Sequence, residues 1–356
     1  MATPELTQTL LDFIAQPHAD EAMFNTLALR LFAHQMQHNA AYGRFCRARG
    51  RTPATVRQWQ DIPAVPVNGF KELTLSCVPV DQCERVFTTS GTTREVKGQH
   101  HHPDLQVWNA SMRRHFADCV GPLPMRMGML FPTEADMPNS SLAHYLQLAL
   151  QDHGLPRSTH LWNAQGVDSA ALLAWVQQAQ TDGQPVALLG ATYSFVHLMD
   201  ALAAQQPDLH LPVGSWLLDT GGFKGRSREI PMEAFYAQLS HTFGVPRTRC
   251  INMYGMTELS SQFYDAGNAS VPSIKRAPHW MRTRAVDPLT GQSVPPGQPG
   301  ILVHTDLANH NSVTTILTED VGIVTEAGFQ LLGRAEGAQA KGCSLAVEDF
   351  VQAAQA

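Results

Sequence analysis

The residues best suited to chemistry lie in one short stretch, Val86–Gly98, with the sequence VFTTSGTTREVKG. Small hydroxylated residues surround one glycine and precede a lysine: Thr88, Thr89, Ser90, Gly91, Thr92, Thr93 and Lys97. Small residues let backbone N–H groups approach a phosphate, hydroxyls add donors, and the lysine supplies compact positive charge. The stretch therefore indicates a phosphate-binding loop, although it lacks the G-x-x-x-x-G-K-S/T pattern of a Walker A loop. A Thr/Ser-rich surface turn is the alternative interpretation.

A hydroxyl and a carboxylate stand side by side in MYGMTE, directly after the apolar run 250–254. At the end of a strand, Thr257 can bond to a phosphate and Glu258 can hold its magnesium ion. Tyr254, next to Gly255, can stack on a base. The alternative is a helix N-terminus, at which Thr257 and Glu258 are capping residues.

Two further stretches follow apolar runs that predict strands. In SWLLDTGGFKGR, Gly221 and Gly222 permit a close approach of the backbone to a flat ring or a phosphate. In PVALLGATYSFVHLMDAL, apolar residues such as Tyr193 and Phe195 could line a pocket for an apolar substrate. Ordinary core packing explains these apolar residues equally well.

Histidines and cysteines give no metal pattern. His100, His101 and His102 are consecutive, so they cannot converge on a metal as residues four apart on a helix do. We expect one of them to line the site and the other two to be solvated. The six cysteines are scattered without a C-x-x-C pair, which argues against a zinc ribbon or a dithiol redox motif.

The elements that must position these residues alternate between helices and strands. Helical patterns cover 4–48, 104–118, 141–154, 167–183 and 228–244, and apolar strands lie between several of them. This alternation predicts an α/β fold with a largely parallel sheet. Residues 284–306 predict a turn-rich hairpin, and 315–324 predict two strands with Asp320 in the turn between them. A flexible Gly/Ala-rich link, Cys343 and a short acidic helix are expected to close the chain.

Composition limits the class of protein. With 356 residues, 44% of them hydrophobic, the chain can form one large domain or two ordinary ones. A formal charge of -6 argues against non-specific nucleic-acid binding. No apolar run approaches the roughly 18–20 residues that span a membrane, and no signal-peptide pattern opens the chain. We therefore expect a cytoplasmic protein.

Taken together, the motifs resemble the adenylate-forming superfamily of acyl-CoA ligases, peptide-synthetase adenylation domains and luciferases. The similar segments are TTSGTTREVKG, DTGGFKG, YGMTE, DPLTGQSVPPGQPGILVH, LTEDVG and LLGRAEG, in the superfamily's order. The resemblance implies the superfamily's N-terminal domain over residues 1–335, with mixed sheets and a small β-rich subdomain at about 270–335. It also implies a short mobile tail over 336–356 in place of the usual C-terminal domain. Arg94 and Val96 depart from the superfamily's phosphate loop.

The segment KGCSL, just past the hinge motif, resembles the acyl-protein synthetase (LuxE-like) family of bacterial luminescence. That resemblance implies adenylation of a carboxylic acid, which is a fatty acid in that family, and transfer of the acyl group to the enzyme's own Cys343. A partner reductase or a carrier protein would then receive the acyl group. The implied small molecules are ATP, Mg²⁺ and a fatty or aryl acid, and the fold class remains α/β.

The resemblance also implies roles for individual residues. Lys97, Thr257, Glu258 and Cys343 would be catalytic, and Glu258 would hold the metal. Nucleotide binding would use Thr89, Ser90, Gly91, Thr92, Thr93, Gly221, Gly222, Phe223, Lys224, Tyr254, Gly255, Asp320 and Arg334. The substrate pocket would include Gly190, Thr192, Tyr193 and Phe195.

Two other functions remain open. The chain could be an adenylating ligase that passes the acyl group to CoA, a carrier protein or an amine without using Cys343. It could also be a degenerate nucleotide-binding or scaffold subunit of a reductase complex. The presence of Lys97, Thr257 and Glu258 argues against the second alternative.

Overall fold

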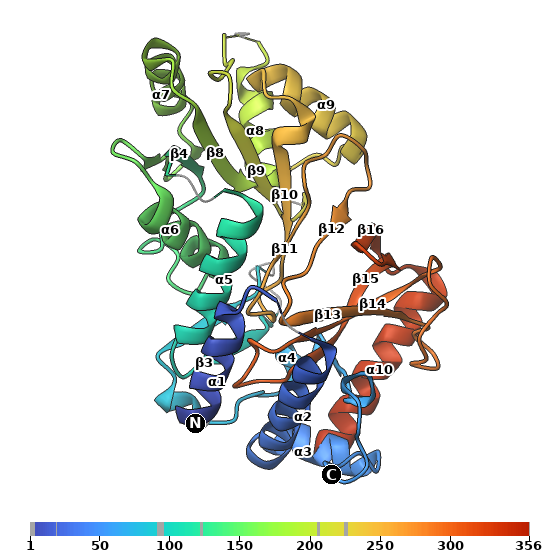
Figure 1. Ribbon diagram of the computed structural model, residues 1–356. Helices are drawn as coiled ribbons and strands as arrows, with labels where there is room; N and C mark the ends of the chain where they lie inside the picture. The colour runs from blue at the N-terminus through green and yellow to red at the C-terminus, as the bar shows by residue number, and fades with distance from the viewer. Residues whose placement is uncertain are drawn as a thin grey trace. The chain divides into compact units, whose positions relative to one another are not determined.

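The computed structural model describes residues 4–18, 20–90, 96–121, 124–204, 207–223 and 227–355 (Figure 1). The chain divides into two compact units. The first comprises Met1–Arg114, Met256–Gln262 and Arg276–Ala356, and the second comprises His115–Gly255 and Phe263–Lys275. One boundary falls inside α5 (Gln106–Cys119), and another falls inside the MYGMTE motif. We describe each unit by itself.

The second unit is built on the parallel sheet that the sequence predicts. Its strand order is β11-β10-β9-β8-β4-β5, and neighbouring strands are parallel except β10 and β11. The strands are β4 (Arg126–Leu130), β5 (Thr159–His160), β8 (Val186–Ala191), β9 (Trp216–Thr220), β10 (Cys250–Tyr254) and β11 (Phe263–Tyr264). Short strands β6 (Trp162–Asn163) and β7 (Gly166–Val167) form a separate ribbon, and β12 (Ile274–Lys275) follows β11. The central strands are buried on both faces, as expected of parallel strands covered by helices.

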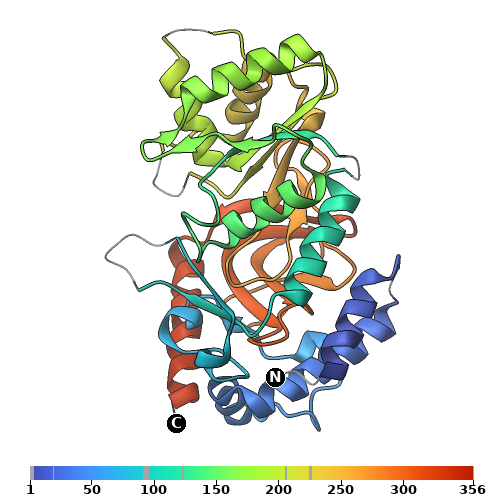
Figure 2. The same cartoon turned by 90° about the vertical axis from the view of Figure 1, so that its left-hand side faces the viewer.

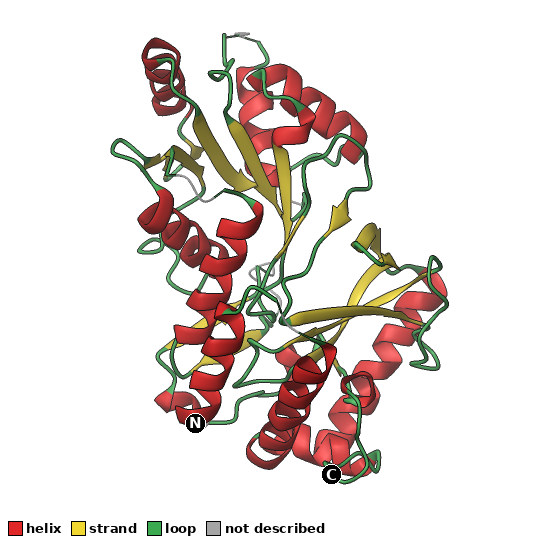
Figure 3. Ribbon diagram, viewed as in Figure 1, coloured by secondary structure: helices red, strands yellow, loops and turns green. Residues whose placement is uncertain are grey.

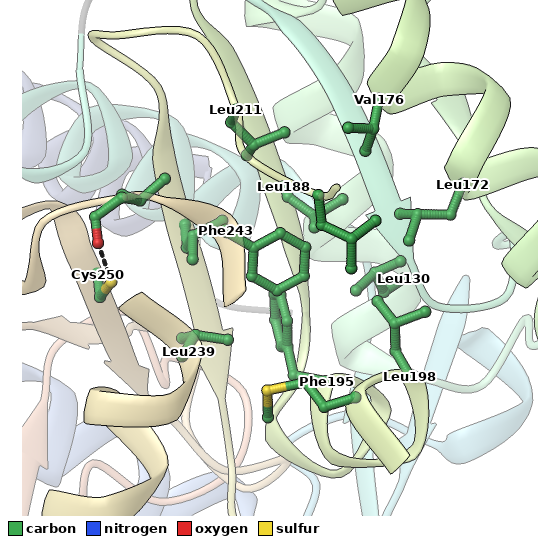
Figure 4. Packing of buried hydrophobic residues seen from close by; sticks show 14 of the residues in the cluster. Leu130, Leu172, Val176, Leu188, Phe195, Leu198, Leu211, Leu239, Phe243 and Cys250 are labelled. Atoms are coloured by element: carbon green, nitrogen blue, oxygen red, sulfur yellow. Dashed lines mark hydrogen bonds between the residues drawn. The ribbon is translucent and has the colours of Figure 1, made fainter. Parts of the chain in front are cut away.

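Helices α6 (Ser141–His153), α7 (Ser169–Asp182), α8 (Thr192–Leu202) and α9 (Met232–Phe243) accompany this sheet. Their ends agree with the predicted glycines, since Gly183 and Gly244 cap α7 and α9 in the left-handed conformation. Leucines and phenylalanines from helices and strands interdigitate in one core, with Phe195 near its centre (Figure 4).

The register of this sheet places the strands that precede the predicted binding residues of this unit side by side, with their ends at the same level. Gly190 pairs with Asp219, and Asp219 pairs with Asn252 on the next strand. The carboxyl ends of β8, β9 and β10 therefore lie at one edge, where parallel α/β sheets usually bind ligands.

The first unit contains the β-rich part of the chain. Antiparallel strands follow the order β16-β15-β14-β13, and β1 (Val65–Pro66) pairs with β15. Their bounds are β13 (Met281–Val286), β14 (Pro299–Asp306), β15 (Thr315–Thr325) and β16 (Gly328–Arg334). A hairpin of β2 (Arg85–Thr88) and β3 (Gln99–His102) carries the predicted phosphate loop.

The N-terminal part of this unit contains the helices α1 (Pro4–Ala15), α2 (Glu21–His38), α3 (Ala40–Ala48) and α4 (Gly69–Glu72). The helical pattern of residues 4–48 is confirmed as three helices: α1 ends at Ala15, α2 begins at Glu21, and Asn39 separates α2 from α3. The Asn39 side chain accepts a hydrogen bond from the backbone N–H of Tyr42 and thereby caps α3.

The predicted flexible link before Cys343 is wrong. Residues Gly337–Gln355 form one continuous helix, α10, which packs against α3, α4, β1 and β15 (Figures 2 and 3). The segment is rich in alanine, the best helix former. Phe350 is fully buried, with its ring centroid 4.8 Å from that of Phe45. Local composition suggested flexibility, but tertiary packing orders the segment.

The predicted position of Asp320 in a turn is also wrong. β15 is continuous from Thr315 to Thr325, and Asp320 lies inside it, opposite Arg334 of β16. Gly322 lies at an irregularity of the pairing between β15 and β16. A Cβ at Gly322 would lie 2.7 Å from the Gln330 carbonyl oxygen, so close packing of the strands requires the glycine.

Within the described ranges, no helix is both long and apolar enough to cross a lipid bilayer.

Candidate active site

The base of the phosphate loop is closed by two hydrogen bonds in the first unit. The Thr89 N–H donates to the Gly98 carbonyl (3.0 Å), and the Gly98 N–H donates to Thr89 Oγ1 (2.9 Å). Ser90 and Lys97 are exposed on either side of this base, where they can meet a ligand. The predicted phosphate ligands Gly91, Thr92 and Thr93 lie outside the described residues.

The Glu258 carboxylate lies next to this base. A Cβ at Gly98 would lie 3.5 Å from Glu258 Oε1 and 3.1 Å from Thr89 Cγ2. Glu258 is only 6% exposed, although it carries a carboxylate. The structure therefore brings together the two sequence motifs that we assigned to phosphate and magnesium, which are about 160 residues apart in the chain.

The backbone around Glu258 is fixed by three side chains, of which only His100 belongs to a group that the sequence analysis singled out. His100 Nδ1 lies 2.9 Å from the Thr257 carbonyl oxygen, and Asn309 Nδ2 donates to the Glu258 carbonyl (2.8 Å). The Ser260 N–H donates to the Asp306 carboxylate (3.0 Å). These hydrogen bonds hold the backbone of the segment 257–260 in place.

His100 and its two neighbours are all buried, so the expectation that two of them are solvated is wrong. His100 is 1% exposed and bonds through both ring nitrogens, since Nε2 lies 3.0 Å from Ser312 Oγ. Burial lowers the pKa of His100 to about 4, so the ring is neutral at neutral pH. A neutral ring with Nδ1 protonated donates to the Thr257 carbonyl and accepts from the Ser312 hydroxyl.

A second cluster in the same unit contains three residues assigned from the resemblance: Asp320, Arg334 and Cys343. Arg334 pairs with Asp320 (3.6 Å) and with Glu319 (2.5 Å). Cys343 Sγ lies 3.9 Å from the Thr318 carbonyl oxygen and interacts electrostatically with the other two residues. Residues of β15, β16 and α10 therefore meet, as a shared site requires.

The Cys343 thiol is covered in this conformation. It is 3% exposed and packs against Val286, Ile301 and Val303. Burial, with a smaller contribution from Glu319, raises the pKa of the thiol above its usual value. The thiol is therefore protonated and shielded while α10 is docked on the sheet.

In the second unit, the ends of the parallel strands are joined by a buried carboxylate. Asp219 is 1% exposed; its Oδ2 accepts from Thr192 Oγ1 (2.7 Å) and Asn252 Nδ2 (2.9 Å). Its Oδ1 accepts from the Tyr236 hydroxyl (2.9 Å). Asp219, near the end of β9, thus fixes the first residue of α8 to β10 and to α9. Polar residues inside the apolar runs WLLDT and CINMY were the sequence signal for this network.

The predicted substrate-pocket residues have different surroundings. Phe195 is fully buried in the core, and Gly190 packs so closely on β4 that a Cβ would lie 2.7 Å from Leu130 Cβ. For these two residues the packing interpretation is correct. The Thr192 hydroxyl is used by Asp219, and the Tyr193 side chain is 7% exposed.

The predicted adenine-binding residues follow β9 and β10. Gly221 is exposed with φ +75°, a conformation that favours glycine, and Gly222 has no atom within 4 Å of where a Cβ would stand. Phe223 packs against the core, and Lys224 lies outside the described residues. Tyr254 ends β10 with its ring 5.7 Å from that of Phe263, and Gly255 follows it half-buried.

Asp219 gives this unit a specific pH dependence. Burial raises its pKa from 3.8 to about 6. Between these values the folded chain binds more protons than the unfolded chain, so the free energy of unfolding falls as pH rises. Asp219→Asn removes this titration, and we expect its stability relative to wild type to increase by up to about 3 kcal/mol between about pH 4 and pH 7.

Melting temperatures across this pH interval test the expectation. The hydrogen bonds lost in Asp219→Asn lower the free energy of unfolding by the same amount at every pH. The test is therefore how the difference in stability between wild type and variant changes with pH. Asp208→Asn is the matched control, because the Asp208 side chain is 70% exposed. A difference in melting temperature between wild type and Asp219→Asn that does not change with pH would contradict the raised pKa of Asp219.

Comparisons with known proteins give a family match over most of the chain. A family model described as "Acyl-protein synthetase, LuxE" matches residues 12–351. A long-chain-fatty-acid–luciferin-component ligase of Vibrio harveyi is 24% identical over 330 residues, which are 89% of this chain and 85% of the relative.

Solved structures share the fold. A crystal structure of 2-hydroxyisobutyryl-CoA ligase with its acyl-AMP superimposes with a TM-score of 0.68 at 16% identity, over 88% of this chain and 67% of that one. ATP-bound MatB from Rhodopseudomonas palustris gives a TM-score of 0.51 at 18% identity, over 72% of this chain and 49% of that one.

Proposed function

The chain belongs to the LuxE acyl-protein synthetase family, and we propose that it activates a fatty acid with ATP and passes the acyl group to its own Cys343. The observation that carries the proposal is the position of the Glu258 carboxylate against the base of the phosphate loop at Gly98. The family relative from Vibrio harveyi is named for a long-chain fatty acid, which supports that substrate class.

In the first step, a carboxylate oxygen of the fatty acid attacks the α-phosphorus of ATP. The bond from the α-phosphorus to the bridging oxygen breaks, and pyrophosphate leaves with the electron pair. Thr89, Ser90, Gly91, Thr92, Thr93 and Lys97 would hold the β- and γ-phosphates, and the Thr257 hydroxyl would bond the α-phosphate. Gly221, Gly222, Phe223, Lys224, Tyr254 and Gly255 would hold the adenine, and Asp320 the ribose, with Arg334 assisting.

Glu258 would hold a magnesium ion in this reaction. Mg²⁺ commonly takes one or two carboxylates and completes its shell with phosphate oxygens and water. A single carboxylate beside the phosphate loop fits this pattern, and the described residues contain no group of three or more His, Cys, Asp or Glu that could hold a metal alone. When bound, the ion offsets negative charge on the phosphates.

In the second step, the Cys343 thiolate attacks the carbonyl carbon of the acyl-AMP. A carbon–sulfur bond forms, the bond to the phosphate oxygen breaks, and AMP leaves with that electron pair; the thiol proton passes to solvent. The docked thiol is buried with a raised pKa. The N-terminal half of α10 must therefore leave the sheet before attack, while Phe350 can keep the C-terminal half anchored.

The burial of Cys343 also favours a second candidate function. If α10 stays docked, the acyl-AMP would react with CoA, a carrier protein or an amine.

An acyl reductase that takes the acyl group from Cys343 is the partner we propose for the main function. The cytoplasmic location predicted from the sequence stays a prediction.

ATP–pyrophosphate exchange with a panel of fatty and aryl acids tests the first step, and intact-protein mass tests the second. We expect exchange with fatty acids and a hydroxylamine-labile acyl adduct on the enzyme. Exchange without an adduct, together with AMP release that depends on CoA or a carrier, would establish the second candidate. Absence of exchange with every acid would contradict adenylation itself.

His100 is expected to act as a positioning residue for this chemistry. Asn in place of His100 keeps a donor near the position of Nδ1 and can preserve the bond to the Thr257 carbonyl. Gln instead keeps a nitrogen near the position of Nε2, which faces Ser312. We expect the kcat for exchange to fall by about tenfold in His100→Gln, the effect of one misplaced transition-state contact.

His100→Asn should retain most of the kcat, and the KM for the fatty acid should change little in either variant. A purely structural role would instead lower the kcat and the melting temperature of both variants together. Equal loss in His100→Asn and His100→Gln would therefore contradict the positioning role.

A further inference from the structure

A cavity of about 720 Å³ adjoins α10 in the first unit. It is lined by the end of α3, residues 60–66, the end of β13 with its following turn, and α10 from Gly342 onward. Its buried lining is apolar and includes Phe45, Ile62, Pro66, Val286, Val303 and Gly342. Its exposed lining is largely polar and includes Arg49, Arg51, Gln60 and Gln292. An apolar interior with a polar rim suits an amphipathic ligand.

The cavity and the Cys343 thiol share their walls. Val286 and Val303, which belong to the same buried cluster as Cys343, also line the cavity, and so do Ala64 and Leu317, which pack against that cluster. Gly342, the preceding residue on α10, lines the cavity as well. A group attached to Sγ can therefore reach the cavity by displacing side chains that already face both spaces.

Two of the neighbours of the thiol leave no room for an attached group. The carbonyl of Thr318 on β15 lies 3.9 Å from Sγ, and Ile301 is fully buried. A Cβ at Gly342 would lie 2.9 Å from Pro288 Cβ, so α10 rests directly on the turn after β13. An acyl chain on docked Cys343 thus has no space among these neighbours.

We infer that the cavity receives the hydrocarbon chain of a medium- or long-chain fatty acyl thioester on Cys343 while α10 is docked. The inference rests on the proposed function, because it requires the thioester at Cys343. The cavity volume lies within the roughly 300–1,000 Å³ of typical small-molecule sites. Arg284 also lines the cavity, and within the described chain its buried Nε has no hydrogen-bond partner. This N–H can serve the polar end of the ligand.

A stored chain is protected from water and from nucleophiles, and this protection can be measured. The full chain is acylated with ATP, magnesium and either myristic or butyric acid, and neutral hydroxylamine is added after excess reagents are removed. Intact mass then follows the loss of the thioester with time. In wild type, we expect the myristoyl thioester to be lost at least about tenfold more slowly than the butyryl thioester, because only the longer chain buries enough apolar surface in the cavity.

Two variants fill the cavity from different elements, Ala346→Phe on α10 and Ala64→Phe in the segment directly before β1. Both are expected to lose the myristoyl thioester about as fast as the butyryl one, with ATP–pyrophosphate exchange unchanged. Ala353→Phe is the matched control, because Ala353 is a half-buried alanine of the same helix that is not among the lining residues. It should behave like wild type.

Equal rates for both thioesters in wild type would overturn the inference, as would wild-type protection in both cavity-filling variants. In either case the proposed function stands, because the thioester forms. Exchange without any thioester would overturn the acceptor role of Cys343 and, with it, the storage site.

Discussion

Replacing Glu258 by glutamine is expected to lower ATP–pyrophosphate exchange by about 100- to 1000-fold, the loss typical of removing a group that stabilises transition-state charge. The reason is the position of the carboxylate, which is 6% exposed and lies beside the base of the phosphate loop. Glutamine keeps the size of the side chain and a carbonyl oxygen but removes the negative charge that attracts Mg²⁺. The fold should survive, because the backbone of this segment is held by His100, Asn309 and Asp306.

The assay should vary the magnesium concentration at saturating ATP. If Glu258 acts on the ion, higher magnesium concentrations should restore part of the lost exchange in Glu258→Gln. Glu326→Gln provides a matched control, because Glu326 is an exposed glutamate in the turn between β15 and β16. Exchange within about twofold of wild type in Glu258→Gln would contradict the metal-binding role, since removal of an essential charge costs far more.

Replacing Cys343 by serine is expected to abolish the hydroxylamine-labile acyl adduct and to leave ATP–pyrophosphate exchange within about twofold of wild type. The two half-reactions use different groups, so the loss of the acceptor should not affect adenylation. Serine adds a poorly compensated hydroxyl among Val286, Ile301 and Val303 and should cost about 1–3 kcal/mol of stability. The melting temperature of the variant therefore belongs in the same experiment.

Cys83→Ser separates the role of Cys343 from that of thiols in general. Cys83 is a free, half-buried cysteine, and its replacement should leave both the adduct and the exchange unchanged. An adduct that persists in Cys343→Ser and disappears in Cys83→Ser would move the acceptor to Cys83. An adduct absent even from wild type, with CoA-dependent turnover, would establish the second candidate function.

Local sequence determined much of the second unit. Strands such as VALLGA and CINMY are mostly apolar and buried along their whole length. Helices of this unit end at Gly183 and Gly244, so composition and periodicity alone predicted the alternating fold. The motifs with special chemistry, such as TTSGTT and YGMTE, also predicted which segments would border a nucleotide site. Each of these signals is contained within a few neighbouring residues.

Other features depended on contacts between distant parts of the chain. Nothing near His100 in sequence indicates that its ring would bond to Thr257 and Ser312, because those partners are more than 150 residues away. Similarly, only the register of β8, β9 and β10, together with the packing of α8 and α9 on them, gathers Thr192, Asn252 and Tyr236 around Asp219.

The sequence by itself determined the class of fold and the order of the motifs, because these follow from residue types and short-range spacing, and it predicts which residues handle phosphate. Only the tertiary structure decided that Asp320 lies within a strand and that Cys343 is covered by a docked helix. Glycine and alanine around Cys343 are compatible with a flexible link and with a helix. The burial of Phe350 and the close contact of Gly342 with Pro288 select the helix, because those contacts contribute free energy that no local pattern contains.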